Sequence, residues 1–188
     1  FVEDVRPFEA MKLRMLNGAH STLAYCGQLL GHETVADAMA DPRLARLVRQ
    51  VMDEAAATLS LPAADLGRYA AALADRFANP ALRHRTAQIA MDGSQKIPQR
   101  LLGTIRDAHD AGGEWGGLAK GVAAWIAYSR RGDVDDPMRA RLAALAADHA
   151  DPLAHADAAL DMREIFGDLA DADWFRTRIR AIVAAMAE

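Results

Sequence analysis

Residues 41–56 read DPRLARLVRQVMDEAA, and this stretch decides the fold class. Its apolar residues recur at intervals of three and four, which is the spacing of one face of an α-helix. Asp41 is a suitable N-cap, and Pro42 fits a first turn because no N–H is needed there. The stretch predicts an amphipathic helix whose buried face is formed by Leu44, Leu47, Val48, Val51, Met52 and Ala55.

Helical periodicity continues through most of the chain on both sides of this stretch, while the alternation typical of strands is absent. Further helices are predicted over residues 66–77, 80–91, 98–110 and 117–128, after Asp136-Pro137, and from Asp173 to the end. Breaks are expected at Gly31, Asn79, Gly93, Gly112 and Gly132, and the glycine pairs at 112–113 and 116–117 are expected to form a loop. The sequence therefore predicts an all-α, multi-helix fold.

Composition predicts one domain over residues 1–188 and excludes several classes of protein. The chain is 52% hydrophobic and 26% charged, which is enough for one core and too little for two large ones. Its net charge of −4 and dispersed arginines argue against a nucleic-acid partner. No apolar run reaches the roughly 20 residues that cross a bilayer, so no membrane partner is expected. The single cysteine, Cys26, predicts no internal disulfide and a small core residue in a cytoplasmic protein.

The most informative stretch for function is MKLRMLNGAH, residues 11–20, which contains Lys12, Asn17 and His20. On an α-helix these three side chains span an arc of roughly 140°, which one cleft could cover. Neighbouring leucines would bury the trio, and buried polar groups need hydrogen-bond partners, one of which can be a ligand. The structural alternative is a lysine that extends along the surface, a helix-bending Asn-Gly pair and a core histidine.

The trio has the chemistry needed to oxidise an alcohol. A lysine can remove the hydroxyl proton if burial favours its uncharged amine, and an amide and an imidazole can donate to the oxygen. This role requires Glu9 to face solvent, because a carboxylate near Lys12 would favour the ammonium form. No zinc-binding pattern is visible, and no lysine follows a tyrosine by four residues, so a lysine-based, metal-independent route is expected.

A second polar stretch, HRTAQIAMDGSQKIPQR, covers residues 84–100. The sequence Asp92-Gly93-Ser94 is typical of a tight turn, which would direct Lys96 and Arg100 into a cleft. Together with Arg85, these cations would suit the carboxylate of a sugar acid. The alternative is that they cap the carbonyl groups of the preceding helix or lie in water.

Both stretches resemble the C-terminal domain of the mannitol dehydrogenase family, the polyol-specific long-chain dehydrogenases and reductases. The similarity covers Pro7 to Ala40, with KLRMLNGAHS, and Asn79 to Arg100, and it continues more loosely toward the C-terminus. The resemblance implies that Lys12 is the general base and that Asn17 and His20 hold the reacting oxygen. It also implies that the second stretch lines the substrate site, where the basic residues look more like those of fructuronate reductases than of mannitol 2-dehydrogenases.

The resemblance further implies an enzyme that uses NAD or NADP and acts on a sugar alcohol or a sugar acid. No strand followed by a glycine-rich turn and a helix is found, so we expect the cofactor to be bound mainly by an N-terminal Rossmann domain of the same polypeptide. This chain would be the helical half that follows that domain, and it should be inactive alone. The alternative is a non-catalytic α-helical interaction module with a structural polar trio.

Overall fold

The computed structural model describes residues 5–187, which are helical with short connections. Residues 5–187 form no strand, and their β-type pairing is an isolated bridge between Thr34 and Arg85. The all-α prediction is therefore confirmed. The elements are α1 (Arg6–Met11), η1 (Lys12–Asn17), α2 (Gly18–Leu30), α3 (Val35–Ala40), α4 (Pro42–Ala56), α5 (Ala63–Phe77), η2 (Pro80–Leu82), α6 (Thr86–Ala90), α7 (Gly93–Ile97), η3 (Pro98–Leu102), α8 (Gly103–Asp110), α9 (Gly116–Ser129), α10 (Arg139–Asp148), α11 (Pro152–Leu160), α12 (Arg163–Phe166), η4 (Gly167–Asp171) and α13 (Asp173–Ala187).

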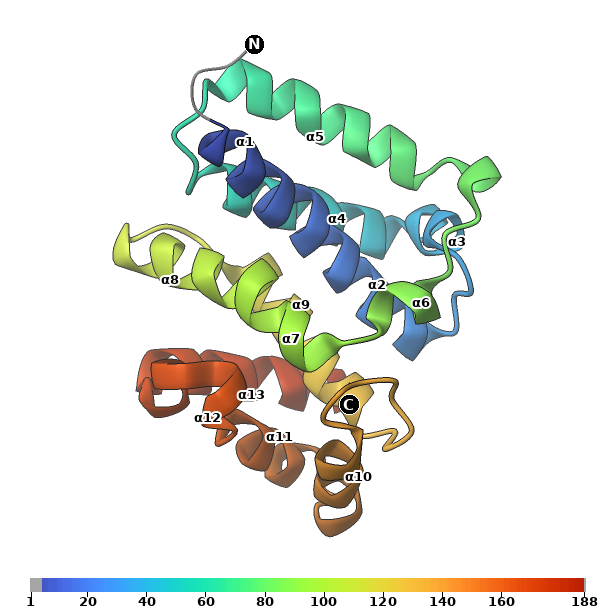
Figure 1. Cartoon of the computed structure of the whole chain (residues 1–188), viewed down its shortest axis with the longest axis vertical. Helices are drawn as coiled ribbons and strands as arrows, with labels where there is room; N and C mark the ends of the chain where they lie inside the picture. Colours follow the sequence, from blue (N-terminus) through green and yellow to red (C-terminus); the bar gives the residue numbers. More distant parts are fainter. Residues whose placement is uncertain (1–4, 188) are drawn as a thin grey trace.

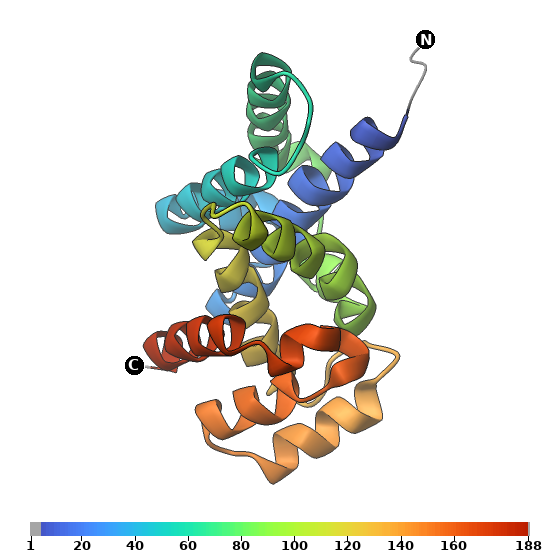
Figure 2. The same cartoon turned by 90° about the vertical axis from the view of Figure 1, so that its left-hand side faces the viewer.

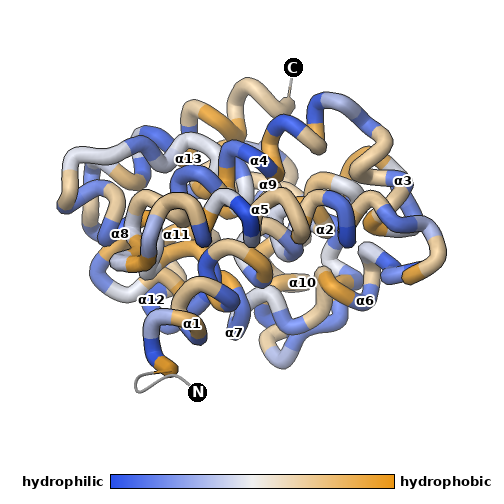
Figure 3. The backbone as a smooth tube through the Cα atoms, turned by 90° about the horizontal axis from the view of Figure 1, so that it is seen from above, coloured by the Kyte–Doolittle hydropathy of each residue, from blue (hydrophilic) through white to orange (hydrophobic). Residues whose placement is uncertain are grey.

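The helices form two tiers that share α9 (Figure 1). One tier holds α1 to α8, and the other holds α10 to α13, with α11 and α13 against α9. Figure 2 shows α1 and the end of α13 at opposite sides of the molecule. Apolar and polar residues alternate along most helices, as expected for elements that each bury one face (Figure 3). None of the described helices is both long and apolar enough to span a bilayer.

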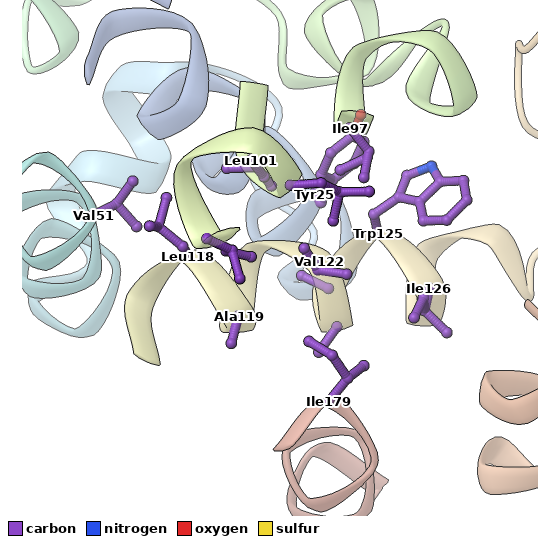
Figure 4. Close-up of a cluster of buried hydrophobic side chains, with 14 of the residues drawn as sticks. Tyr25, Val51, Ile97, Leu101, Leu118, Ala119, Val122, Trp125, Ile126 and Ile179 are labelled. Atoms are coloured by element: carbon purple, nitrogen blue, oxygen red, sulfur yellow. The ribbon is translucent and has the colours of Figure 1, made fainter. Parts of the chain in front are cut away.

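The core is built around α9, which is buried almost all round (Figure 4). Val122 lies at its middle, with Tyr25 and Leu101 on one side and Ile179 of α13 on the other. All four side chains are fully buried. Close packing in this region holds η1 and α2, which carry Lys12, Asn17 and His20, against η3, which carries Arg100.

The helix predicted from residues 41–56 is confirmed as α4. Asp41 caps it through a hydrogen bond from the backbone N–H of Arg43 to Oδ1, at 2.8 Å, and Pro42 occupies the first turn. Val48, Val51 and Met52 are buried, whereas Leu47 is only half-buried. The sequence pattern therefore identified both the helix and nearly all of its buried face.

The helix predicted over residues 117–128 is confirmed as α9, but the expectation that Gly116 and Gly117 belong to a loop is wrong, because they form its first turn. The reason is a cap supplied by another helix. Glu54 of α4 is only 6% exposed, and its carboxylate accepts the backbone N–H groups of Gly117 at 2.8 Å and Leu118 at 2.9 Å. A carboxylate is favoured at a helix N-terminus, where N–H groups lack partners within the helix.

Glu54→Gln should destabilise the fold, because it replaces a charged acceptor by an amide that presents N–H groups to other donors. We expect the free energy of unfolding to fall by about 2 kcal/mol. Urea denaturation of the variant and of Asp53→Asn would measure this effect. Asp53 is the exposed neighbour, and its replacement should leave stability nearly unchanged. Equal stability of the two variants would contradict the capping role.

The helix predicted over residues 80–91 is also wrong, because the chain is broken in its middle. A short 3₁₀ turn covers Pro80–Leu82, and α6 is confined to Thr86–Ala90. Between them, Arg83 adopts a left-handed conformation with φ of 45°. The backbone then pairs with residues 33–35, through bonds from Val35 N–H to His84 O at 2.9 Å and from Thr86 N–H to Glu33 O at 3.0 Å. This long-range pairing explains why the helical periodicity of residues 80–91 did not produce a continuous helix.

The helix predicted over residues 98–110 begins earlier, at Gly93, and runs without a break through α7, η3 and α8. The left-handed residue before it is Asp92, with φ of 57°, so the chain breaks at Asp92 rather than at Gly93. Pro98 has no N–H to continue the α-helical bonding, and the helix widens into a π segment at this residue. The helices α3, α11 and α12 were not predicted.

Candidate active site

Lys12, Asn17 and His20 lie on one continuous helical segment formed by α1, η1 and α2. Its central part, Lys12–Asn17, is π-helical, and the N–H of Gly18 bonds to the carbonyl of Leu13, five residues earlier. A π turn holds more residues than an α turn, so Asn17 lies closer to the face of Lys12 than the α-helical arc predicts. π-Helical turns are frequent at functional sites.

The expectation that neighbouring leucines bury Lys12 is wrong, because its side chain is exposed. The π turn and the position of Lys12 near the start of the first helix place it beyond the packed core. Glu9 is exposed, and no ion pair joins it to Lys12 within residues 5–187, as the base role requires. Asn17 is half-buried, and its side-chain amide has no hydrogen-bond partner among these residues.

His20 is the most enclosed member of the trio. Its ring stacks on Phe77 at a centroid distance of 4.9 Å and lies 5.9 Å from the ring of His84. The Nε2 atom of His20 is buried and has no hydrogen-bond partner in the described structure. Because buried polar atoms are normally paired, the unpartnered Nε2 marks His20 as a candidate for ligand binding.

The pKa of His20 is lowered to about 4, mainly by burial and then by the nearby charges of His84 and Arg100. The imidazole is therefore neutral at pH 7, with one ring nitrogen able to donate and the other able to accept. A neutral ring can donate to an alcohol or carbonyl oxygen without bringing a second positive charge beside the neighbouring cations.

This shift predicts a pH dependence of stability. Between about pH 6.5 and pH 4 the unfolded chain binds a proton at residue 20 that the folded chain does not bind, so acidification favours unfolding. The contribution of His20 should fall by up to about 1.4 kcal/mol per pH unit across this range. Urea denaturation of the protein and of His20→Phe at several pH values would measure it. The variant should lose less stability on acidification, and parallel curves would contradict the prediction.

The second polar stretch contacts the first across η3 and α2. Arg100 is half-buried, and its Nη1 donates to Ser21 Oγ at 3.0 Å. A Cβ atom placed on Gly18 would lie 3.0 Å from the carbonyl oxygen of Arg100, so the two backbones pass very close to each other. The structure thus brings Arg100 beside the helix that carries the trio.

The two cations of this stretch differ in their partners. Lys96 donates to the carbonyl of Ile89 at 3.2 Å and lies 3.8 Å from a carboxylate oxygen of Asp92, which is the capping arrangement considered above. Arg100 forms no ion pair with a carboxylate among the described residues, and burial lowers its pKa. A half-buried guanidinium with only a hydroxyl partner is suited to bind an anion.

Arg85 does not join this group. Its exposed side chain lines a separate hollow of about 500 Å³ with Gln28, Tyr128 and Arg131. A second hollow, of about 430 Å³, is apolar and includes Cys26 and Met186 on the side formed by α13. Cys26 therefore lines a surface hollow in addition to contacting the core.

Sequence reasoning missed two contacts of the site. Phe77 at the end of α5 and Ser21 on α2 contact His20 and Arg100, respectively. Phe77 lies 57 residues from His20 along the chain, so no local signal indicates the contact. Ser21 directly follows His20 and could have been singled out as a polar residue one position from the trio.

Comparison with known proteins agrees with this architecture. Residues 4–187 match the family model described as mannitol dehydrogenase C-terminal domain. D-mannonate oxidoreductase of Escherichia coli K12 is 54% identical over 149 residues, which are 74% of this chain and 31% of that protein. Mannitol 2-dehydrogenase of Aspergillus terreus is 36% identical over 177 residues, which are 89% of this chain and 34% of that protein. The chain thus spans about a third of these curated relatives.

A solved structure supports the same assignment. The ternary complex of Pseudomonas fluorescens mannitol 2-dehydrogenase with NAD and D-mannitol superposes with a TM-score of 0.89 at 30% identity. The match covers 100% of this chain and 40% of that one. The family match extends over nearly the whole chain, including both polar stretches. The chain therefore belongs to the mannitol dehydrogenase family, as its C-terminal domain.

Proposed function

We propose that this chain is the catalytic and substrate-binding part of an NAD(P)-dependent oxidoreductase that interconverts a hexuronate and its sugar-acid alcohol, as a fructuronate reductase does. The observation that carries the proposal is the unpartnered, buried Nε2 of His20 near a half-buried Arg100 that has no acidic partner. One group can hold the reacting oxygen, and the other can hold a carboxylate. The 54% identity to D-mannonate oxidoreductase favours a sugar acid over a neutral polyol.

In this mechanism Lys12 exchanges a proton with the substrate oxygen. During oxidation its amine takes the hydroxyl proton, and during reduction its ammonium group returns a proton to the carbonyl oxygen. The amide of Asn17 and the neutral imidazole of His20 donate hydrogen bonds to the same oxygen, where negative charge develops. Because Lys12 is exposed in residues 5–187, bound substrate and cofactor would have to supply the desolvation that its uncharged form needs.

The nicotinamide cofactor would supply the hydride acceptor or donor. Residues 5–187 contain no strand followed by a glycine-rich turn and a helix, so they do not fit the pyrophosphate of a dinucleotide. We propose that a Rossmann domain in the same polypeptide holds it. The chain's own contribution is then the proton exchange, the hydrogen bonds to the oxygen and the orientation of the substrate, with no metal ion required.

A substrate screen of the full-length polypeptide tests this function. We expect the protein to reduce fructuronate or tagaturonate with a higher kcat/KM than fructose. The loss of reduced nicotinamide absorbance would measure each rate. Arg100→Gln should lower kcat/KM for the acid by about tenfold or more, because an ionic hydrogen bond to the carboxylate is lost. The loss for fructose should be much smaller. Exclusive activity on neutral polyols would overturn the sugar-acid assignment, and absence of any turnover would favour a non-catalytic interaction module.

A further inference from the structure

The turn that precedes Lys96 and Arg100 is held by a residue far along the chain. Asp92, the residue before α7, adopts a left-handed conformation, and its own side chain does not cap that helix. The cap comes from Asp136 in the segment before α10. Asp136 Oδ2 accepts the backbone N–H of Ser94 at 2.8 Å, and Oδ1 accepts the Ser94 hydroxyl at 2.6 Å.

The same carboxylate also fixes its own segment. Asp136 Oδ1 accepts the backbone N–H of Met138 at 2.8 Å. A further bond, from the N–H of Asp92 to the carbonyl of Asp135 at 3.0 Å, joins the two backbones directly. Asp136 and Ser94 are 9% and 5% exposed, so water competes little for these bonds. One buried carboxylate thus bonds both the first turn of α7 and the residue that precedes α10.

This arrangement fixes the helix that carries both cations. Ser94 is in the first turn of α7, Lys96 follows two residues later, and Arg100 lies one further turn along, in η3. The other end of this unit is fixed where the Arg100 carbonyl meets Gly18. Loss of the Asp136 bonds would free one end of the unit and let the cations tilt relative to His20.

We infer that Asp136 is a positioning residue, which orients Arg100 toward the carboxylate of the substrate. The inference rests on the function proposed above. The 133–138 segment, which lies between the two tiers, would then control substrate affinity. Asp136 itself would not contact the substrate.

The test compares Asp136→Asn with Asp135→Asn in the full-length polypeptide. Both variants remove one negative charge, but the Asp135 bond is made by its backbone carbonyl and is kept. Asp136→Asn should raise KM for the hexuronate about tenfold, because the amide nitrogen that replaces one carboxylate oxygen cannot accept a hydrogen bond, while kcat stays within about twofold. Asp135→Asn should leave both constants unchanged. Ser94→Ala, which loses the hydroxyl bond and keeps the backbone bond, should have an intermediate effect.

A double-mutant cycle separates positioning from a general loss of folded protein. If Asp136 acts through Arg100, then Asp136→Asn should raise KM much less when Arg100 is already glutamine. Equal effects in both backgrounds, an unchanged KM in Asp136→Asn, or a fall in kcat without a rise in KM would overturn the inference. Each of these results leaves the proposed function intact if the unmodified protein reduces hexuronates. A failure of the unmodified protein to turn over any sugar acid would overturn both.

Discussion

Replacing Lys12 by alanine in the full-length polypeptide should lower kcat by about 10²- to 10⁴-fold, the usual contribution of a positioned acid or base. The expected loss is in the proton transfer, because the alanine side chain cannot exchange a proton with the substrate oxygen. KM should change much less, since Asn17, His20 and Arg100 remain to bind the substrate. Steady-state rates at saturating hexuronate and cofactor would measure the loss.

Two further measurements make this result specific. Added small primary amines should restore part of the activity of Lys12→Ala, because a free amine can occupy the vacated space and exchange the proton. Lys120→Ala is the matched control, since Lys120 is also exposed but lies on α9, where it lines the apolar hollow. It should keep normal rates. Near-normal turnover by Lys12→Ala would show that Lys12 is not the general base.

Gly93→Ala should be the most destabilising single change in the second polar stretch. A Cβ atom at Gly93 would lie 2.2 Å from Nε1 and 2.7 Å from Cδ1 of Trp125, and 3.0 Å from the hydroxyl oxygen of Tyr25. Both aromatic side chains are buried in the core and have no open space into which to move. We expect the free energy of unfolding to fall by about 3 kcal/mol, the upper end of the usual cost of overpacking.

Gly67→Ala is the control for this substitution. Gly67 is an exposed residue within α5, and a Cβ atom there would meet nothing within 4 Å. Alanine should therefore stabilise the helix by about 0.5–1 kcal/mol, because it reduces the backbone freedom of the unfolded chain. Urea denaturation of both variants should give changes of opposite sign. Unchanged or increased stability of Gly93→Ala would show that Trp125 moves aside easily and would contradict the prediction.

The parts of the fold that local signals determine were predictable from the sequence. Helix α4 has its cap, its proline and its apolar face within 16 residues, and it was predicted correctly. Helix α9 was predicted to begin at Gly117, one residue after its observed start, but its cap was not predicted, because Glu54 lies more than 60 residues away. The same holds for Arg83 to Arg85, whose helix is interrupted by pairing with residues 33–35. Long-range hydrogen bonds leave no periodic signal in the sequence.

The candidate site was predictable to a similar extent. The sequence identified Lys12, Asn17 and His20 as one group, and Arg100 lies beside the helix that carries them. It did not reveal the π turn, where bonding changes from four to five residues in a segment that packs against η3. The exposure of Lys12 and the stacking of His20 on Phe77 depend on how separate helices meet. Their roles in catalysis stay predictions.

The close passage of Gly18 and the Arg100 carbonyl has a mechanical consequence. Glycine lets that oxygen lie 3.0 Å from the position of a Cβ atom, and sliding one helix along the other would bring the oxygen against the side chains of the residues next to Gly18. The contact therefore resists sliding of the segment that carries the proposed base along the segment that carries Arg100.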